Sequence, residues 1–548
     1  MKLFPFLAAF LFILYSSTTT IAGTDSIDEI LNNEYAVRGV EGPIKCGTVD
    51  LLRILNSATA NGHAMKAAIA ASTRPVMQSF VDSPSGRFRI HYDLSGFNAP
   101  DLSDLDLNAV PDYVDSTAFY LDYAWELIID ELGYAAPMGD GLRGGEPSGM
   151  IDCYIKELGF KYGVAIPDNS SGKTSARMEI DNDFIGFNFN TSGYDALKVT
   201  TAHEFFHVVQ YSYHGASKAS LWWMEHTAVW IEDRAWDNVN DYIHWLEPLF
   251  SKRNVPINDG GSFYYAASMF AFHIAEEYGD GMIRSLWNKF RETQSGNILN
   301  FNTVLPEGVA KTLSDLAVWL YFTGERSNTA FFRDSDIIFS SLEIEKQLTT
   351  YSGDGSLTLK NHTFKYIEIE PEDGFVSGDT LKVAFTESNG GNWKKQVIFY
   401  NTPYDYSIQP LNGEKASAYL NKSYKKAILV IANSATLGRD YDLVYSYETV
   451  ETTPVNKRPQ PYSFAIQTAY PNPFNAATTI PFTLDAEGQA RLTVHNLQGA
   501  VVAELVDTVL PAGTHSAAFD ASGMASGIYF ASLISKGRRE TAKLLYLK

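Results

Sequence analysis

Two histidines four residues apart, with a glutamate directly after the first, form the most specific chemical pattern in this sequence. The residues are His203, Glu204 and His207, within the run T-A-H-E-F-F-H-V-V-Q. In a helix, residues at i and i+4 lie on one face, so both imidazoles can bind one metal ion. We therefore predict a Zn²⁺ site with His203 and His207 as ligands and Glu204 as the general base.

The run around this pattern is predicted to be helical. Val208 and Val209 supply apolar positions, and neither Pro nor Gly interrupts the run before Gly215. Thr200 or Thr201 is expected to cap the start of this helix.

A catalytic zinc site has three protein ligands, and Glu225 is predicted to be the third. It lies on a second apolar helical stretch, L-W-W-M-E-H-T-A-V-W-I-E. A carboxylate among tryptophans is costly to bury unless it is paired or bound to a metal. Glu232 and His226 are the alternatives. Glu225 and Glu232 can share a helix face, so that one binds the metal while the other orients a histidine.

These two segments resemble the gluzincin metallopeptidases, in which an H-E-x-x-H helix is followed by a second helix with a glutamate ligand. Trp222, Glu225 and Ala228 are similar to the W-x-x-E-x-x-A pattern around that ligand. The wider region from Phe88 to Thr323 resembles a family of secreted bacterial metalloproteases typified in myxobacteria. The resemblance implies a zincin-like domain, with a mixed sheet and the metal-binding helix, that hydrolyses peptide bonds.

The resemblance also implies a tyrosine or histidine that stabilises the oxyanion of the tetrahedral intermediate. Tyr265 is the candidate for this role, and Tyr264 is the alternative. Both open an apolar run, Y-Y-A-A-S-M-F-A-F, which is predicted to form a helix behind the site. His273, on the same run, is expected to be a core histidine.

The N-terminus is predicted to be a cleaved secretory signal. Lys2 precedes an apolar run from Leu3 to Tyr15, and a stretch of small residues ends at Ala22. No later run is long and apolar enough to span a bilayer. Residues 1–22 are therefore expected to be removed, and the mature protein to act outside the cytoplasm. The net charge of −21 argues against nucleic acid as a partner.

The chain has only two cysteines, Cys46 and Cys153. In an exported protein, an even pair predicts a disulfide bond. The alternative is that Cys46 caps the zinc as a latency switch, within an N-terminal prosegment at residues 23–87. That role requires a free thiolate, so a bond between the two cysteines would exclude it.

An acidic stretch, D-L-D-L-N-A-V-P-D-Y-V-D, has the spacing of a calcium-binding loop. Oxygen side chains at alternating positions suit a hard cation, and a helical run from Phe119 to Leu132 can brace the loop. Ala109 stands where such loops usually have glycine. The predicted Ca²⁺ ligands are Asp104, Asp106, Asn108, Asp112 and Asp115.

The rest of the chain predicts sheets. Alternating segments at 149–155 and 176–181 predict strands before the metal helix, in a metallopeptidase domain at 88–330. Further short alternating segments predict a β-sandwich at 340–450. They are Leu357–Leu359, Phe364–Ile369, Thr380–Phe385, Gln396–Tyr400, Ala427–Ala432 and Tyr441–Tyr447. Polar, proline-punctuated residues 451–465 are expected to be a linker.

The last stretch, residues 466–548, is predicted to be a small immunoglobulin-like sandwich. Its Y-P-N-P-F-N opening, its G-I-Y-F strand and its short apolar and basic end resemble the C-terminal sorting domain of the type IX secretion system. The resemblance implies export to the outside or the cell surface, with the secretion machinery as a partner.

The chain is therefore predicted to be a multidomain α+β protein, with a zincin-like metallopeptidase domain followed by two all-β immunoglobulin-like sandwich modules. Two classes of function follow. The first is a secreted zinc peptidase that acts on protein or peptide substrates, either an endopeptidase, which we favour, or an aminopeptidase. The second is a catalytically degenerate metal-binding surface or adhesion protein. The presence of Glu204 favours the peptidase, because a structural zinc site has four closed ligands and no need of a base.

Overall fold

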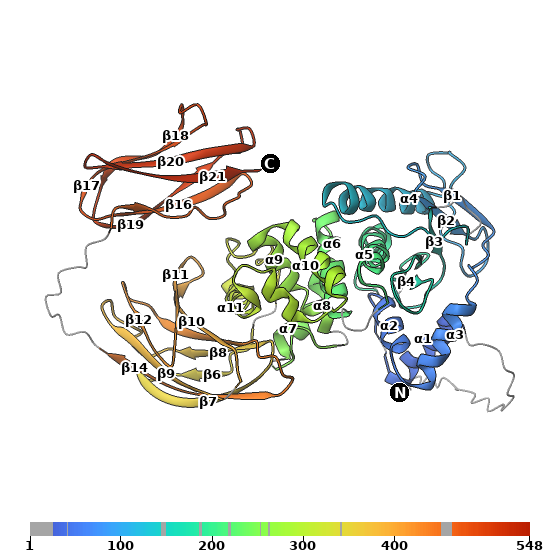
Figure 1. The fold of residues 1–548 in the computed structure, drawn as a ribbon, viewed down its shortest axis with the longest axis horizontal. Helices are drawn as coiled ribbons and strands as arrows, with labels where there is room; N and C mark the ends of the chain where they lie inside the picture. The colour runs from blue at the N-terminus through green and yellow to red at the C-terminus, as the bar shows by residue number, and fades with distance from the viewer. Residues whose placement is uncertain are drawn as a thin grey trace, which may run out of the picture. The chain divides into compact units, whose positions relative to one another are not determined.

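The computed structural model describes residues 26–547, apart from 41, 144–148, 186–188, 217–220, 253, 261–262, 340–341, 389 and 451–462. The predicted signal at 1–22 and most of the predicted linker lie outside these residues. The chain divides into two compact units, one of Met1–Ser377 with Leu381–Thr449, and one of Gly378–Thr380 with Val450–Lys548 (Figure 1). In the described residues, no helix has the length and apolar character needed to cross a membrane.

A mixed five-stranded sheet forms one side of the larger unit. Its order is β1 (Ser79–Asp82), β2 (Phe88–Tyr92), β3 (Ile151–Ile155), β5 (Ala176–Ile180) and β4 (Gly163–Pro167). Strands β2, β3 and β5 run parallel, whereas β1 and β4 pair antiparallel at the two edges. β3 and β5 lie where the alternating segments predicted strands. β4 was not predicted, since it is short, begins with glycine and ends with proline.

The long helix α5 (Gly193–His214) packs beside this sheet at β4 and β5, and a second long helix, α6 (Leu221–Ala235), packs against α5. α5 begins earlier than its sequence pattern suggested, because Ser192 is its N-cap residue. The prediction that Thr200 or Thr201 caps the helix is therefore wrong. Both lie inside it, and the Thr201 hydroxyl donates to the Lys198 carbonyl at 2.8 Å.

An N-terminal group of helices belongs to the same unit: α1 (Ile27–Arg38), α2 (Thr48–Leu55) and α3 (Ala60–Ala71). Their apolar residues, such as Leu31 and Leu52, are fully buried in the core that also contains the residues of α5 and α6. The N-terminal region is thus packed onto the sheet and helices rather than detached from them.

The remaining helices continue this core. The helical run predicted from Phe119 to Leu132 corresponds to α4 (Asp112–Trp125), which connects β2 to β3 and continues as a π-helix, η1 (Glu126–Glu131). The run at 264–272 is not one helix, since α8 ends at Ala266 and α9 begins at Met269. The other elements are η3 (Asp241–Trp245), α7 (Glu247–Ser251), α8 (Phe263–Ala266), α9 (Met269–Tyr278), α10 (Asp280–Thr293), η4 (Ile298–Thr303), α11 (Gly308–Tyr321) and η5 (Gly324–Arg326).

A β-sandwich completes the larger unit. One sheet has the order β11-β10-β13-β8-β6 and the other β12-β9-β14-β7. All the segments predicted as strands lie in it, and β6, β11 and β12 are additional. The strands are β6 (Lys346–Leu348), β7 (Ser352–Lys360), β8 (Thr363–Ile369), β9 (Thr380–Glu387), β10 (Trp393–Thr402), β11 (Asp405–Pro410), β12 (Lys415–Tyr419), β13 (Lys426–Asn433) and β14 (Asp440–Val450).

The sandwich shares buried surface with the helices. The Tyr366 hydroxyl on β8 donates to the Ala317 carbonyl of α11 at 2.6 Å, and the Gln396 amide donates to the Ser314 hydroxyl at 2.8 Å. Tyr366, Ile398 and Val430 belong to the main core, whereas the opposite face of their sheet packs in a core of its own.

The smaller unit is a second sandwich, with sheets β15-β16-β19 and β18-β17-β20-β21 around a separate apolar core. Its strands are β15 (Ala465–Ile466), β16 (Ala477–Leu484), β17 (Gly488–His495), β18 (Val501–Leu510), β19 (Gly513–Asp520), β20 (Gly527–Ser535) and β21 (Arg538–Tyr546). The chain is thus a multidomain α+β protein with two sandwich-like modules after the helical region.

Candidate metal centre

α5 brings both histidines of the H-E-F-F-H pattern to one point. The Nε2 atoms of His203 and His207 lie 3.0 Å apart. α6 contributes Glu225, whose carboxylate oxygens lie 3.1 Å from His207 Nε2 and 3.4 Å from His203 Nε2. The three predicted zinc ligands therefore meet, although they come from two helices.

Each histidine is oriented through its other ring nitrogen. His203 Nδ1 lies 2.5 Å from Glu232 Oε1, and His207 Nδ1 lies 2.7 Å from Gln210 Oε1. Glu232 therefore takes the orienting role that the sequence left open between it and Glu225. Gln210 was not predicted, although it follows His207 by three residues and so lies on the same helix face. Its amide is fixed in turn by donating to the Met224 carbonyl at 3.0 Å.

These contacts leave a position between His203, His207 and Glu225 that suits a cation. Because acceptor oxygens occupy both Nδ1 atoms, each ring turns Nε2 toward the space shared with Glu225. Neither oxygen of Glu225 has a hydrogen-bond donor, although the side chain is completely buried. Lone pairs and a carboxylate facing one another at 3.0 to 3.4 Å repel unless a positive charge lies between them. Tetrahedral Zn²⁺ places its ligands about 3–4 Å from one another.

Burial and neighbouring charges shift the pKa values of Glu225, His203 and Glu204. Burial raises the pKa of Glu225, but His207 and His203 outweigh burial and hold that pKa at about 2. Burial lowers the pKa of His203, but Glu225 and Glu232 outweigh it and raise that pKa to about 10. Burial also raises the pKa of Glu204, against the opposing effect of both histidines. The carboxylates of Glu225 and Glu232 thus give this point a negative charge that a proton or a metal cation would balance.

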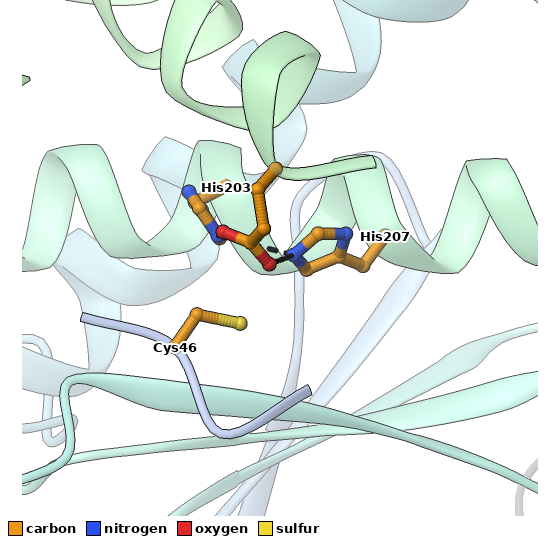
Figure 2. A group of neighbouring side chains, drawn as sticks. Cys46, His203 and His207 are labelled. Atoms are coloured by element: carbon orange, nitrogen blue, oxygen red, sulfur yellow. Dashed lines mark hydrogen bonds and ion pairs between the residues drawn. The ribbon is translucent and has the colours of Figure 1, made fainter. Parts of the chain in front are cut away.

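Cys46 is the fourth residue at this centre, and the predicted disulfide is wrong. Cys46 and Cys153 are both free and buried. Cys153 lies in the middle of β3, hydrogen-bonded between β2 and β5. The Sγ of Cys46 instead lies with ligand atoms of His203, His207 and Glu225, all within 4.8 Å of one another (Figure 2).

Of the other residues predicted around the site, Tyr265 and Tyr264 lie close to the metal ligands, whereas His226 does not join them. The Tyr265 hydroxyl donates to the Cys46 carbonyl at 3.3 Å, so Tyr265 borders the centre. Tyr264 lines a neighbouring pocket with Val49 and Arg53. His226, the alternative ligand, does not join the group. Its ring packs edge-on against Trp222, with centroids 5.2 Å apart.

His273 is buried within the core, as expected. Its ring packs edge-on against that of Trp319, with centroids 4.9 Å apart.

The acidic loop before α4 brings together fewer residues than predicted. Asp104, Asp106 and Asp112 offer oxygens within 4.8 Å of one another. Asp115 lies outside that group and accepts a hydrogen bond from the Asn108 amide at 2.6 Å. α4 begins at Asp112, so the expected last ligands are already on the helix. Calcium binding here stays a prediction.

Comparison with known proteins identifies the C-terminal module. A family model described as a secretion system C-terminal sorting domain matches residues 468–546. The chain is therefore sorted by the type IX secretion system, and the protein is secreted or held at the cell surface. Its partner in export is the secretion machinery.

The other comparisons say less. No curated protein matches the chain. A periplasmic inhibitor of g-type lysozyme from Aeromonas hydrophila is 13% identical, over 19% of this chain and 96% of that chain, with a TM-score of 0.15. A β-1,2-glucanase from Parabacteroides distasonis is 13% identical over 36% and 37%, with a TM-score of 0.13. Tripeptidyl peptidase 2 is 8% identical over 38% and 31%, with a TM-score of 0.16. Likenesses this low carry no argument about fold or function.

Proposed function

We propose that this protein is a secreted zinc metallopeptidase with a zincin-like domain at residues 88–330, and that it cleaves protein substrates internally. One observation carries the proposal: His203, His207 and Glu225 converge on one buried point with Glu204 beside them. The first three would hold Zn²⁺. Bound there, the ion would act as a Lewis acid on the scissile carbonyl and lower the pKa of water to about 7.

The residues of the chain supply the remaining chemistry. Glu204 takes the proton from the attacking water at a carboxylate oxygen and delivers it to the leaving amine. Glu232 and Gln210 hold the two imidazoles in the tautomer that presents Nε2. Tyr265 donates its hydroxyl hydrogen to the oxyanion that forms on the attacked carbonyl.

The second candidate is a metal-binding surface protein without catalysis. It is favoured by the position of Cys46 Sγ beside the other three candidate ligands, because four closed protein ligands are typical of structural zinc. This reading leaves Glu204 without a role, which is why we prefer the peptidase.

Digestion of an unfolded protein by the zinc-loaded chain and by Glu204→Gln tests the proposal. Loss of a general base is expected to lower the rate by at least about 100-fold. Glu247→Gln, at an exposed residue of α7, is the matched control and should keep the wild-type rate. Because the site is buried, each form is also assayed after limited proteolysis of the N-terminal region. Equal cleavage by Glu204→Gln and wild type, or none by any form, would contradict the proposal.

A further inference from the structure

The segment that contains Cys46 lies along the free edge of β4. The Gly47 amide donates to the Gly163 carbonyl at 2.8 Å, and the Tyr162 amide donates to the Ile44 carbonyl at 3.0 Å. The other edge of β4 pairs with β5. An exposed strand edge beside a catalytic residue is where an extended peptide binds through its backbone. Residues 44–48 thus occupy the place that a substrate would need.

Thr48 contacts the proposed base directly. Its hydroxyl donates to Glu204 Oε2 at 2.9 Å, while the same hydroxyl oxygen accepts from the Ala165 amide of β4 at 2.7 Å. A base whose oxygen is engaged in this way is less able to take a proton from water.

Lys45 reaches the residue that orients the first histidine. Its ammonium lies 2.8 Å from Glu232 Oε2 and forms an ion pair with Asp241. The side chain is only 3% exposed, so this pair is shielded from water. Glu232 therefore joins the N-terminal segment to His203.

Tyr265 completes the contacts with this segment. Its hydroxyl, which we assign to the substrate oxyanion, donates to the backbone carbonyl of Cys46 at 3.3 Å. The carbonyl of Cys46 lies where Tyr265 can bind a peptide carbonyl, and the thiol of the same residue lies at the metal ligands.

The segment also seals the centre from solvent. His203 is 2% exposed, and Glu204, His207 and Glu225 are 0% exposed. Figure 2 shows the Cys46 side chain reaching toward the two histidines from the opposite side of the centre to α5. With the segment in place, neither water nor a peptide can reach the proposed active site.

We propose that Cys46 is the fourth ligand of the metal and that Lys45–Thr48 hold the peptidase latent. This inference rests on the proposed function, since it concerns the same metal. Activation would require withdrawal of the segment, which would leave the position of the Cys46 thiolate open to water, and the released thiolate would take up a proton from solvent. The connection from the N-terminal helices to β1 at Ser79 is accessible to a protease near Val76, which is 97% exposed.

Cobalt substitution tests the coordination without any peptide substrate. Co²⁺ bound to a thiolate gives a near-ultraviolet charge-transfer band, so the full wild-type chain should show this band and Cys46→Ala should lose it. Cys153→Ala is the matched control and should retain it, because Cys153 lies within β3. Absence of the band from wild type with Co²⁺ bound would overturn the ligand assignment.

Alkylation of wild type checks the assignment in case a variant does not fold. Zn²⁺ should slow the labelling of Cys46 at least about tenfold relative to the chelated protein, identified by peptide mass. Equal labelling of Cys46 with and without Zn²⁺ would overturn the assignment.

Limited proteolysis between Ala71 and Ser79, followed by removal of the N-terminal fragment, tests latency. Peptide hydrolysis should rise at least about tenfold. Equal activity before and after removal of the fragment would overturn latency. A cobalt–thiolate band with no hydrolysis in any form would support the ligand and overturn the peptidase, so the two proposals fail separately.

Discussion

At the scale of single residues, the candidate metal centre depends on side chains that lie outside its set of ligands. Gln210 holds His207 Nδ1 at 2.7 Å and is itself held by the Met224 carbonyl and the Thr227 hydroxyl. Residues that orient a metal-binding histidine raise its basicity and fix its tautomer. Without this amide, His207 Nδ1 would lose its hydrogen-bond partner.

We therefore expect Gln210→Ala to weaken Zn²⁺ affinity by about tenfold or more. Competition with a chromogenic chelator measures this affinity. Gln347→Ala on β6, where the side chain is exposed, is the control and should bind as wild type does. Unchanged affinity in Gln210→Ala would show that this contact does not support the metal.

Gly163 on β4 lies directly against the proposed base. A Cβ at this position would lie 2.8 Å from Glu204 Cγ and 2.9 Å from Thr200 Cγ2. Both neighbours are on α5 and fully or almost fully buried, so they have little room to move. Only glycine allows β4 to approach the helix this closely.

Gly163→Ala is accordingly expected to destabilise the protein by about 1–3 kcal/mol, because it overpacks the contact between β4 and α5. Urea unfolding measures the change. Gly281→Ala in α10 is the control, since no atom lies within 4 Å of its Cβ position. A Gly163→Ala protein as stable as the control would mean that β4 can move away from α5.

The residues that sequence could identify are those with local spacing. His203, Glu204 and His207 follow from helix periodicity, and Glu225 from the cost of a carboxylate among tryptophans. The place of Cys46 at the metal ligands was raised from the sequence only as the alternative to a disulfide, because the number of cysteines and the compartment do not decide which side chains meet. The contact of Thr48 with Glu204 joins residues far apart in sequence, and no periodicity reports it.

At the scale of elements, the turn after β5 contains an acid that the fold buries. Asp181 accepts hydrogen bonds from the amides of Leu158 at 3.0 Å and Phe184 at 2.8 Å. Burial raises its pKa to about 6, against the lowering effect of these backbone donors. Its stabilising contribution is therefore complete below pH 3.8, its ordinary pKa, and is lost as the pH rises through about 6.

Asp181→Asn should remove this pH dependence. Between about pH 4 and pH 7 the wild type is expected to lose about 2 kcal/mol of unfolding free energy from this group, which the variant does not lose. The measurement is the difference between the two proteins in urea unfolding at both pH values. If the unfolding free energies of wild type and Asp181→Asn differed by the same amount at both pH values, Asp181 would not be the source of the pH dependence.

The elements themselves were predictable where their patterns are long or strictly alternating. β8, β9, β13 and β14 alternate or are continuously apolar, so they were found. β4 was missed because five residues that include glycine and proline carry little pattern. Its edge position depends on the order of strands in the sheet, which a single sequence does not reveal.

At the scale of the whole molecule, the two sandwiches differ in their relation to the helices. The sandwich at 346–450 shares the main core through Tyr366, Ile398 and Val430. The module after Val450 has an apolar core of its own and forms a separate unit. The matched sorting domain at 468–546 lies in that separate unit.

A chain that ends at Thr449 should therefore unfold at the same temperature as the corresponding transition of the full chain, within about 2 °C. Scanning calorimetry separates the two transitions. In the producing cell, the same truncation should stop export, because the sorting domain is gone. A large loss of thermal stability in the truncated chain would show that the units are not independent.

Burial of the metal centre has a consequence for the kinetics of metal exchange. Every proposed ligand is almost inaccessible while residues 44–48 cover the centre, so an ion cannot enter or leave the closed chain without opening it. Loading would then be a step of folding, completed before the segment closes. Exchange of isotopically labelled zinc into the intact protein would be limited by the rate at which that segment opens. Removal of zinc by a chelator would have the same limiting rate.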